Sequence, residues 1–306
     1  MKKIISAVLA AAVMAVSLFG CSNGETGSSA GSAAGGTDAS KISGQIHISG
    51  SSALQPLVQA AADNFREKNP DVSITVNAGG SGTGLQNVAD KTVDVGNSDV
   101  FAEEKLTADK ASALKDHIVC VVGVAAVVNP KAGVTNLTKQ QLVDIFTGKT
   151  ANWKEVGGQD QKIVIMNRPA SSGTRSLFKQ YALDGKDEAT GKALTEDNSG
   201  TLKQNVAQTK GAIAYLAFSY LTDNSVTALS IDGVKPNYEN VYSGKYGVWG
   251  YEHMYTNGEA TGAAKSFINY IESADFEKTV TEKGYGIAKK MTVKRDAPAA
   301  KTSASK

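Results

Sequence analysis

Strand-like and helix-like segments alternate along most of this 306-residue chain, and this alternation restricts the fold more than any other feature. Short runs of β-forming residues predict strands at residues 45–49, 72–78, 92–99, 162–167 and 246–256. Apolar residues three and four positions apart predict helices from Pro56 onward and at residues 84–90, 138–148, 174–183 and 262–273. The apolar run at residues 117–130 suits a strand buried on both faces. The chain is therefore expected to be α/β, with mostly parallel sheets.

The first 20 residues have the order of a secretory signal peptide. A positive start is followed by a nearly all-apolar stretch at residues 4–17 and then by Gly-Cys. Residues 18–21 resemble a bacterial lipobox, whose cysteine receives a lipid such as palmitate. We expect residues 1–20 to be a lipoprotein signal peptide and Cys21 to be the lipidation site. The alternative is an N-terminal transmembrane anchor, because the apolar stretch is near the lower length limit for a span.

Residues 21–41 consist largely of Gly, Ser and Ala, with almost no bulky side chain. Such a stretch buries too little surface to offset its ordering entropy, so we expect a flexible tether. About 250 residues remain, which is more than one core usually serves, and two lobes are expected.

The charge balance and the cysteine count exclude several classes of protein. The formal net charge of the whole chain is +2, with no basic stripe, which argues against nucleic acid as a partner. The chain has two cysteines, and lipid on Cys21 would leave Cys120 without a partner. Cys120 lies in an apolar run and is expected to be a small buried hydrophobic residue.

Three strand-to-helix connections share one composition of glycine and hydroxyl residues. They are Gly50-Ser51-Ser52-Ala53, Gly79-Gly80-Ser81-Gly82-Thr83-Gly84 and Pro169-Ala170-Ser171-Ser172-Gly173-Thr174. Each delivers free N–H groups and hydroxyl donors to a helix N-terminus, where an anion is favoured. In a single connection these residues ordinarily serve only as an N-cap and a turn. Three together, one of them preceded by Arg168, predict a cradle for a small oxyanion.

Arg168 and Asp99 define the expected chemistry of the ligand. Arg168 stands at a strand end, where its planar guanidinium can pair with two oxygens of a phosphate or carboxylate. Asp99 would repel a fully deprotonated anion but can accept the hydrogen of a protonated one. Phosphate keeps a proton near neutral pH and sulfate does not, so Asp99 would discriminate by about 10⁴–10⁵-fold. Its ordinary alternative role is that of a turn aspartate.

Motifs for catalysis, cofactors and metals are incomplete. Gly148-Lys149-Thr150 lacks the earlier glycine of a phosphate-binding loop, since Val143 occupies that position. Position 83 is threonine, so Ser81 is not in a Gly-x-Ser-x-Gly elbow. The three histidines are scattered, without metal-ligand spacing. We expect no catalytic residues, no cofactor and no metal.

With these residues assembled, the chain resembles the substrate-binding lipoproteins of phosphate ABC transporters. The likeness runs in order through GSSALQPL, GGSGTG, DVGNSD, NRPASSGTR and GAIAYLAFSYL. It implies a type II periplasmic-binding-protein fold with two lobes, residues 42–120 plus 249–306 and residues 121–248, joined by two crossover strands. It also implies an extracytoplasmic, lipid-anchored receptor that passes inorganic phosphate to the permease subunits.

The resemblance carries the phosphate-binding roles onto particular residues. These are Ser52, Ala53, Ser81, Asp99, Arg168, Ser172, Gly173 and Thr174. Relatives often have an acidic residue that orients the arginine between it and the Ser-Gly-Thr turn, but here Pro169 and Ala170 occupy that gap. The group that orients Arg168 is left open, as is the choice between phosphate and arsenate.

Three alternatives to a phosphate receptor remain. The first is a binding protein for another tetrahedral oxyanion, such as sulfate or molybdate. The second is a secreted phosphatase or serine hydrolase that uses Ser81 or Ser172, which the missing base and elbow disfavour. The third is a structural surface protein without a ligand.

Overall fold

A mixed β-sheet runs through the part of the chain that the computed structural model describes, residues 41–189 and 194–299. The strands, in chain order, are β1 (Gly44–Gly50), β2 (Val72–Ala78), β3 (Val95–Ser98), β4 (Leu114–Val128), β5 (Asn136–Leu137), β6 (Val164–Asn167), β7 (Leu194–Thr195), β8 (Ala212–Ala217), β9 (Thr227–Ala228), β10 (Ser230–Ile231) and β11 (Trp249–Asn257). The α-helices are α1 (Gln55–Lys68), α2 (Ser81–Ala89), α3 (Ala108–Ser112), α4 (Lys139–Phe146), α5 (Gly173–Ala182), α6 (Ser199–Gln208), α7 (Tyr238–Tyr242), α8 (Gly262–Glu272) and α9 (Glu277–Glu282). The predicted α/β class is confirmed.

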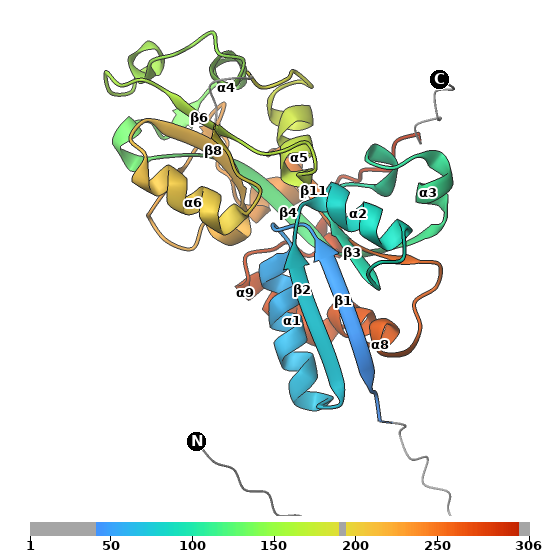
Figure 1. The fold of residues 1–306 in the computed structure, drawn as a ribbon. Helices are drawn as coiled ribbons and strands as arrows, with labels where there is room; N and C mark the ends of the chain where they lie inside the picture. Colours follow the sequence, from blue (N-terminus) through green and yellow to red (C-terminus); the bar gives the residue numbers. More distant parts are fainter. Residues whose placement is uncertain (1–40, 190–193, 300–306) are drawn as a thin grey trace, which may run out of the picture. The chain divides into compact units, whose positions relative to one another are not determined.

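The main sheet has the strand order β2-β1-β3-β11-β4-β8-β6-β7. Pairing is parallel between β1 and both β2 and β3, and between β6 and both β7 and β8. At the centre, β11 runs antiparallel to β3 and β4, and β4 runs antiparallel to β8 (Figure 1). The prediction of mostly parallel sheets is therefore right for the outer strands and wrong for the centre, where two long strands run against their neighbours.

Strand β4 passes between two hydrophobic cores. Every residue from Cys120 to the end of β4 is buried, which confirms the prediction for most of the apolar run. The prediction is wrong for residues 117–119, where Ile118 is 40% exposed. Cys120 itself packs in the core that contains β1, α1 and α8, whereas the residues from Val121 onward pack in the core that contains α4, α5 and β8. Cys120 is free and fully buried, as expected.

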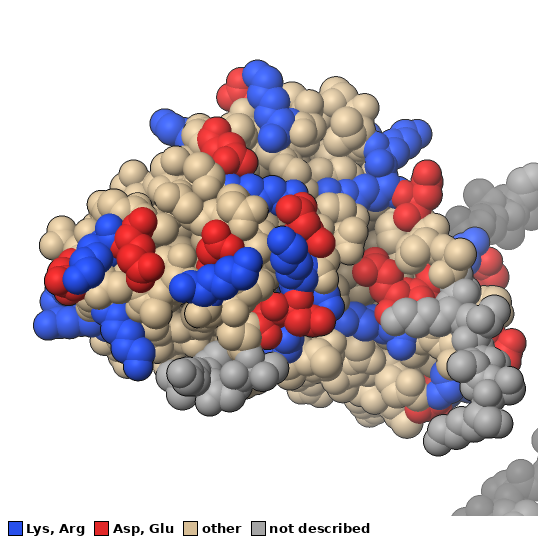
Figure 2. All heavy atoms as spheres, turned by 90° about the horizontal axis from the view of Figure 1, so that it is seen from above, with Lys and Arg blue, Asp and Glu red and all other residues tan. Residues whose placement is uncertain are grey.

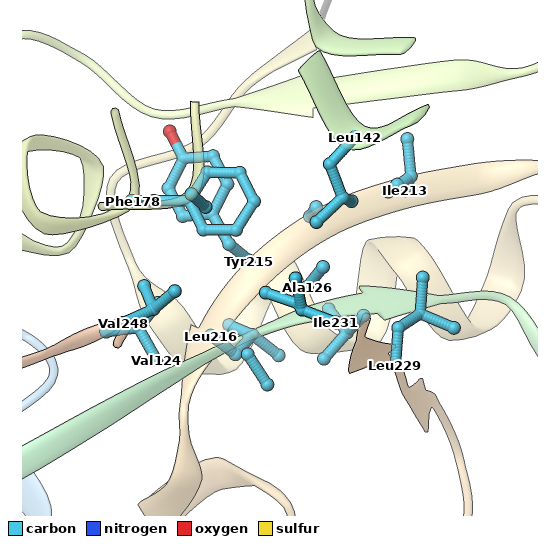
Figure 3. Packing of buried hydrophobic residues seen from close by; sticks show 14 of the residues in the cluster. Val124, Ala126, Leu142, Phe178, Ile213, Tyr215, Leu216, Leu229, Ile231 and Val248 are labelled. Carbon is cyan, nitrogen blue, oxygen red and sulfur yellow. The ribbon is translucent and has the colours of Figure 1, made fainter. Parts of the chain in front are cut away.

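The second core fixes α5 against β8. The ring of Phe178, on α5, stacks on the ring of Tyr215, on β8, with centroids 4.4 Å apart and planes 14° apart (Figure 3). Phe146, from α4, meets the Phe178 ring edge-on at 5.0 Å. Stacked and edge-on aromatic contacts add to the hydrophobic stabilisation of burial, so the orientation of α5 is well determined.

Helix α2 begins three residues earlier than the sequence pattern predicts, at Ser81 instead of Gly84. Glycine lowers helix propensity, so the glycine-rich start has no helical signal of its own. Gly80, with φ of +81°, turns the chain before the helix. The hydroxyls of Ser81 and Thr83 consequently lie in the first turn of α2, not in a loop before it.

None of the helices described within residues 41–189 and 194–299 is long and apolar enough to cross a membrane. The predicted signal peptide, the lipidation site Cys21 and most of the tether lie outside the described residues. On the face drawn in Figure 2, Lys and Arg side chains are interspersed with Asp and Glu side chains.

Candidate functional site

The predicted connections meet at the carboxyl ends of the strands. The order β2-β1-β3 is parallel, so the chain leaves all three strands at one edge of the sheet, at Gly80, Ser52 and Asp99. The parallel pair β6 and β7 likewise delivers Arg168 and Asp197 to one edge. Ligands of open α/β sheets bind beyond such edges.

Arg168 is fully buried and is held by groups from two other connections. Its Nη1 donates to Ser199 Oγ at 2.8 Å, and its Nη2 donates to Ser52 Oγ at 2.8 Å and to the carbonyl of Asp197. The Ser52 hydroxyl donates to the Asp197 carbonyl at 3.0 Å and lies 3.0 Å from Ser199 Oγ. The planar fork of the guanidinium is thereby fixed in one orientation.

An acidic side chain also lies beside Arg168, although Pro169 and Ala170 fill the adjacent sequence positions. Asp197 Oδ1 is 3.9 Å from Arg168 Nη2. Burial raises the pKa of this carboxyl and the guanidinium opposes the rise. Asp197, about thirty residues further along the chain, is therefore the carboxylate that accompanies Arg168.

A second group of contacts surrounds Asp99. Thr174 Oγ1 donates to Asp99 Oδ2 at 2.7 Å, and the Asp99 N–H donates to Ser81 Oγ at 3.0 Å. A side chain at Gly173 would place its Cβ 2.2 Å from Ser81 Oγ and 2.9 Å from Asp99 Cβ, so only glycine permits this approach of α5. The first turns of α2 and α5 therefore converge on one buried carboxylate.

The arginine group and the aspartate group are parts of one site. The Gly82 N–H donates to the carbonyl of Ser171 at 2.8 Å, which joins the start of α2 to the turn before α5. A Cβ at Gly80 would lie 3.2 Å from Asp197 Oδ1, so the same loop reaches the neighbour of Arg168. Seven of the eight predicted ligand residues contribute to this convergence through side chain or backbone, and they are Ser52, Ser81, Asp99, Arg168, Ser172, Gly173 and Thr174.

Ala53 differs from its expected arrangement. Its amide donates to Ser51 Oγ at 3.0 Å, so this donor has an internal partner. The Ala53 carbonyl accepts from Tyr285 Oη, and the Ser52 carbonyl accepts from Tyr220 Oη at 2.7 Å. Burial raises the pKa of Tyr220 to about 12, so the phenol remains a donor at neutral pH. The two tyrosines hold the first connection in place.

Asp197 and Ser199 were not predicted, although the sequence carries a signal for them. Ser-Gly-Thr occurs at residues 81–83, at 172–174 and again at 199–201, and each copy opens a helix. At the third copy Asn198 is the N-cap of α6, with its side chain accepting from the Thr201 N–H. The strand before it, β7, has only two residues, which is too short to show a strand pattern.

Arg175 supports Arg168 from behind. Arg175 Nη1 donates to the Arg168 carbonyl, and Arg175 Nε lies 3.5 Å from Glu188 Oε2. Burial raises the pKa of Glu188. Ser172 caps α5 by accepting from the Arg175 N–H at 3.2 Å, and its own hydroxyl hydrogen can still be donated.

Three buried atoms at the site have no hydrogen-bond partner among the described residues. They are the acceptors Asp99 Oδ1 and Asp197 Oδ1 and the donor Arg168 Nε. Buried polar groups are nearly always paired in native proteins, so such atoms indicate a missing partner. A protonated oxyanion has the complementary groups, since it can accept from a guanidinium and donate to a carboxylate.

Each of the three histidines has a partner other than the serines of the candidate site. His47 lies near Asp94, His117 near Thr256 and Glu272, and His253 near Asp116. The described residues hold no group of three His, Cys, Asp or Glu side chains that could bind a metal ion.

This mixed sheet, with two central antiparallel strands and a polar site at the strand ends, is the fold of the type II periplasmic binding proteins. Residues 33–275 match the family model described as a PBP superfamily domain. The phosphate-binding protein PstS of Bacillus subtilis is 56% identical over 296 residues, which cover 96% of this chain and 97% of that protein. The chain therefore belongs to the PBP superfamily and, within it, to the family of PstS phosphate-binding proteins.

Solved structures agree with this assignment. A Clostridium perfringens protein described as a phosphate ABC transporter substrate-binding protein, with bound phosphate, is 34% identical. It superposes with a TM-score of 0.74 over 80% of this chain and 100% of its own. An ABC-type phosphate transport receptor from Vibrio cholerae is 29% identical, with a TM-score of 0.60 over 80% and 100% of the two chains. These names describe binding proteins, which agrees with the expectation that the chain is not an enzyme.

Proposed function

We propose that this protein is a receptor for inorganic phosphate that delivers its ligand to an ABC permease. The observation that carries the proposal is the pair of buried groups at one site, a guanidinium donor and a carboxylate acceptor, each with an atom that lacks a partner. Hydrogen phosphate complements both, because it carries negative oxygens and one O–H. The names of the Bacillus, Clostridium and Vibrio relatives support the same ligand.

In this proposal each predicted residue has a distinct role. Arg168 compensates the charge of the ligand, and Asp99 accepts its proton. The other donors are the hydroxyls of Ser81 and Ser172 together with the N–H groups of Gly173 and Thr174. The hydroxyls of Ser52 and Thr174 and the N–H of Ala53 would donate to the ligand by giving up their bonds to the Asp197 carbonyl, Asp99 and Ser51. Donation from the start of α5 adds the positive end of a helix dipole.

Calorimetry with phosphate and sulfate tests the proposal. The parent protein should bind phosphate at least about 10⁴-fold more tightly than sulfate, because a buried carboxylate rejects an anion without a proton. Asp99→Asn should largely abolish this preference, since an amide can donate to sulfate. Arg168→Ala should weaken phosphate binding by about 100-fold through loss of a charge-assisted pair. Equal affinity of the parent for both anions would contradict the assigned role of Asp99.

The proposal also covers two lobes and a lipid anchor. The lobes are residues 42–120 plus 249–306 and residues 121–248, and the change of core between Cys120 and Val121 supports the first limit. Trp249 and Tyr251 pack in the core of the second lobe, so the crossover on β11 extends beyond residue 249.

Lipid on Cys21 would hold the receptor outside the cytoplasmic membrane. The intact mass of detergent-extracted protein, compared with a Cys21→Ser variant, tests the anchor.

A further inference from the structure

Glu252 is a fully buried carboxyl group that the expected ligand set does not use. It lies on β11, where all residues from Trp249 to Thr256 are buried. Neither of its carboxyl oxygens has a hydrogen-bond partner among the described residues. An unpaired buried carboxyl is costly, so its position calls for an explanation.

The sheet brings Glu252 next to Asp99. His253 of β11 and Ser98 of β3 form the last pair of an antiparallel ladder, and Glu252 and Asp99 are the residues that adjoin this pair, with an irregularity of the strand between Glu252 and His253. The negative charge of Asp99 acts directly on the Glu252 carboxyl, so the two groups lie close together. Asp99 Oδ1 is likewise without a partner, and a carboxylate oxygen has two lone pairs, one for the ligand and one for Glu252. Two carboxyl groups with unpaired oxygens thus lie close together at the base of the site.

Among the described residues, the other groups that interact electrostatically with Glu252 are a thiol and three phenols, which are uncharged at neutral pH. They are Cys120, Tyr220, Tyr238 and Tyr285. Burial, followed by the negative charge of Asp99, raises the pKa of Glu252 well above its usual range. Two adjacent buried carboxyls disfavour each other's charged form, so one of them keeps a proton.

The hydrogen bonds decide which carboxyl keeps the proton. Asp99 Oδ2 accepts from Thr174 Oγ1, and this donor favours the charged form of Asp99. Glu252 accepts from no described donor, so its charged form has no comparable support. The proton therefore belongs on Glu252, and the charge belongs on Asp99.

We propose that Glu252 is a neutral carboxylic acid that donates a hydrogen bond to Asp99. This bond positions Asp99, the carboxylate that accepts a hydrogen bond from the protonated oxygen of the ligand. This inference rests on the proposed phosphate function. A bond from an O–H to a carboxylate is short and strong, so it would fix the rotamer of Asp99. With Glu252 as the donor, Asp99 has no hydrogen of its own to offer, and sulfate finds no partner there.

Two substitutions separate this role from simple packing. Glu252→Met keeps the approximate volume but removes the donor, and Glu252→Gln keeps a donor but cannot ionise. We expect Glu252→Met to weaken phosphate binding by about tenfold, because Asp99 loses a hydrogen-bond partner. The ratio of phosphate affinity to sulfate affinity should fall as well. Glu252→Gln should restore most of the affinity lost in Glu252→Met. His253→Gln, at the next residue of the same strand, whose ring bonds to Asp116, is the control for disturbance of β11.

An infrared measurement reports the protonation state directly. The difference spectrum of parent minus Glu252→Gln should contain the carbonyl band of a neutral carboxylic acid at about pH 8, far above the ordinary pKa of a glutamate. The same band should persist in His253→Gln. Absence of the band, or phosphate binding by Glu252→Met equal to that of the parent, overturns the inference. Failure of the parent itself to bind phosphate overturns the proposed function instead.

Discussion

At the scale of single residues, the site depends on how one buried arginine is held. A lone guanidinium on a mobile side chain would lose much of its binding energy in becoming ordered. Here the fork is directed by Ser52, Ser199 and the Asp197 carbonyl. This support comes from the turn before α1 and from the start of α6, and it replaces the acidic neighbour that the Arg168 turn lacks.

Ser199→Ala tests this support. The substitution removes a hydrogen bond to a charged group, which contributes about 1.5–3 kcal/mol when buried, so phosphate affinity should fall by at least about tenfold. Calorimetry is the measurement, and circular dichroism should show an unchanged fold. Thr201→Ala, two residues further on in the same helix and exposed, is the matched control. Parent-like affinity in Ser199→Ala would mean that Arg168 is held by other groups.

At the scale of helices and strands, the sequence predicts local pieces well and their partners poorly. The alternation of periodic segments locates all the strands of the site except β7. The glycine and hydroxyl turns locate five of the residues that converge, and the strand ends locate Asp99 and Arg168. These are local patterns within about ten residues. The antiparallel centre of the sheet, the position of Glu252 close to Asp99 and the bond from Tyr285 to Ala53 depend on residues far apart in the chain. No local periodicity encodes such a register.

The start of α5 provides the prediction at this scale. Gly173→Ala would force a Cβ to within 2.2 Å of Ser81 Oγ, so α5 must move away from α2. We expect phosphate binding to fall by about 100-fold or more, since a small misplacement of donors weakens every contact at once. Gly247→Ala is the control, because nothing lies within 4 Å of the added Cβ. Calorimetry compares the two variants, and unchanged binding by Gly173→Ala would show that the close approach is dispensable.

At the scale of the whole described chain, two hydrophobic cores share the strands β4 and β11. Residues of both strands belong to both cores, since Cys120 and Met254 lie in one while Val121 and Tyr251 lie in the other. Crossover strands of this kind allow two lobes to close on a ligand as hinged bodies. A residue that ties the C-terminal segment to one of these crossover strands would affect both the stability of the protein and the release of its ligand.

Arg295, near the C-terminus, is such a residue. Its guanidinium carbon lies 3.3 Å from the ring centroid of Tyr181, on α5, and 4.0 Å from that of Trp249, at the start of β11. It also donates to the carbonyls of Trp249 and Gly247. Arg295 thus joins the C-terminal segment to α5 and to one crossover strand. Its planar shape serves both ring contacts, which a lysine could not reproduce.

Arg295→Ala should therefore destabilise the protein and speed the release of phosphate. Loss of cation–π contacts and of charged hydrogen bonds costs about 2 kcal/mol, which corresponds to a fall in Tm of about 4–8 °C for a chain of this size. Lys294→Ala, an exposed neighbour, should melt with the parent. Calorimetric melting and stopped-flow release of phosphate measure the two effects. A lower Tm with unchanged release would restrict Arg295 to stability, and an unchanged Tm would contradict its role as a tie between α5 and β11.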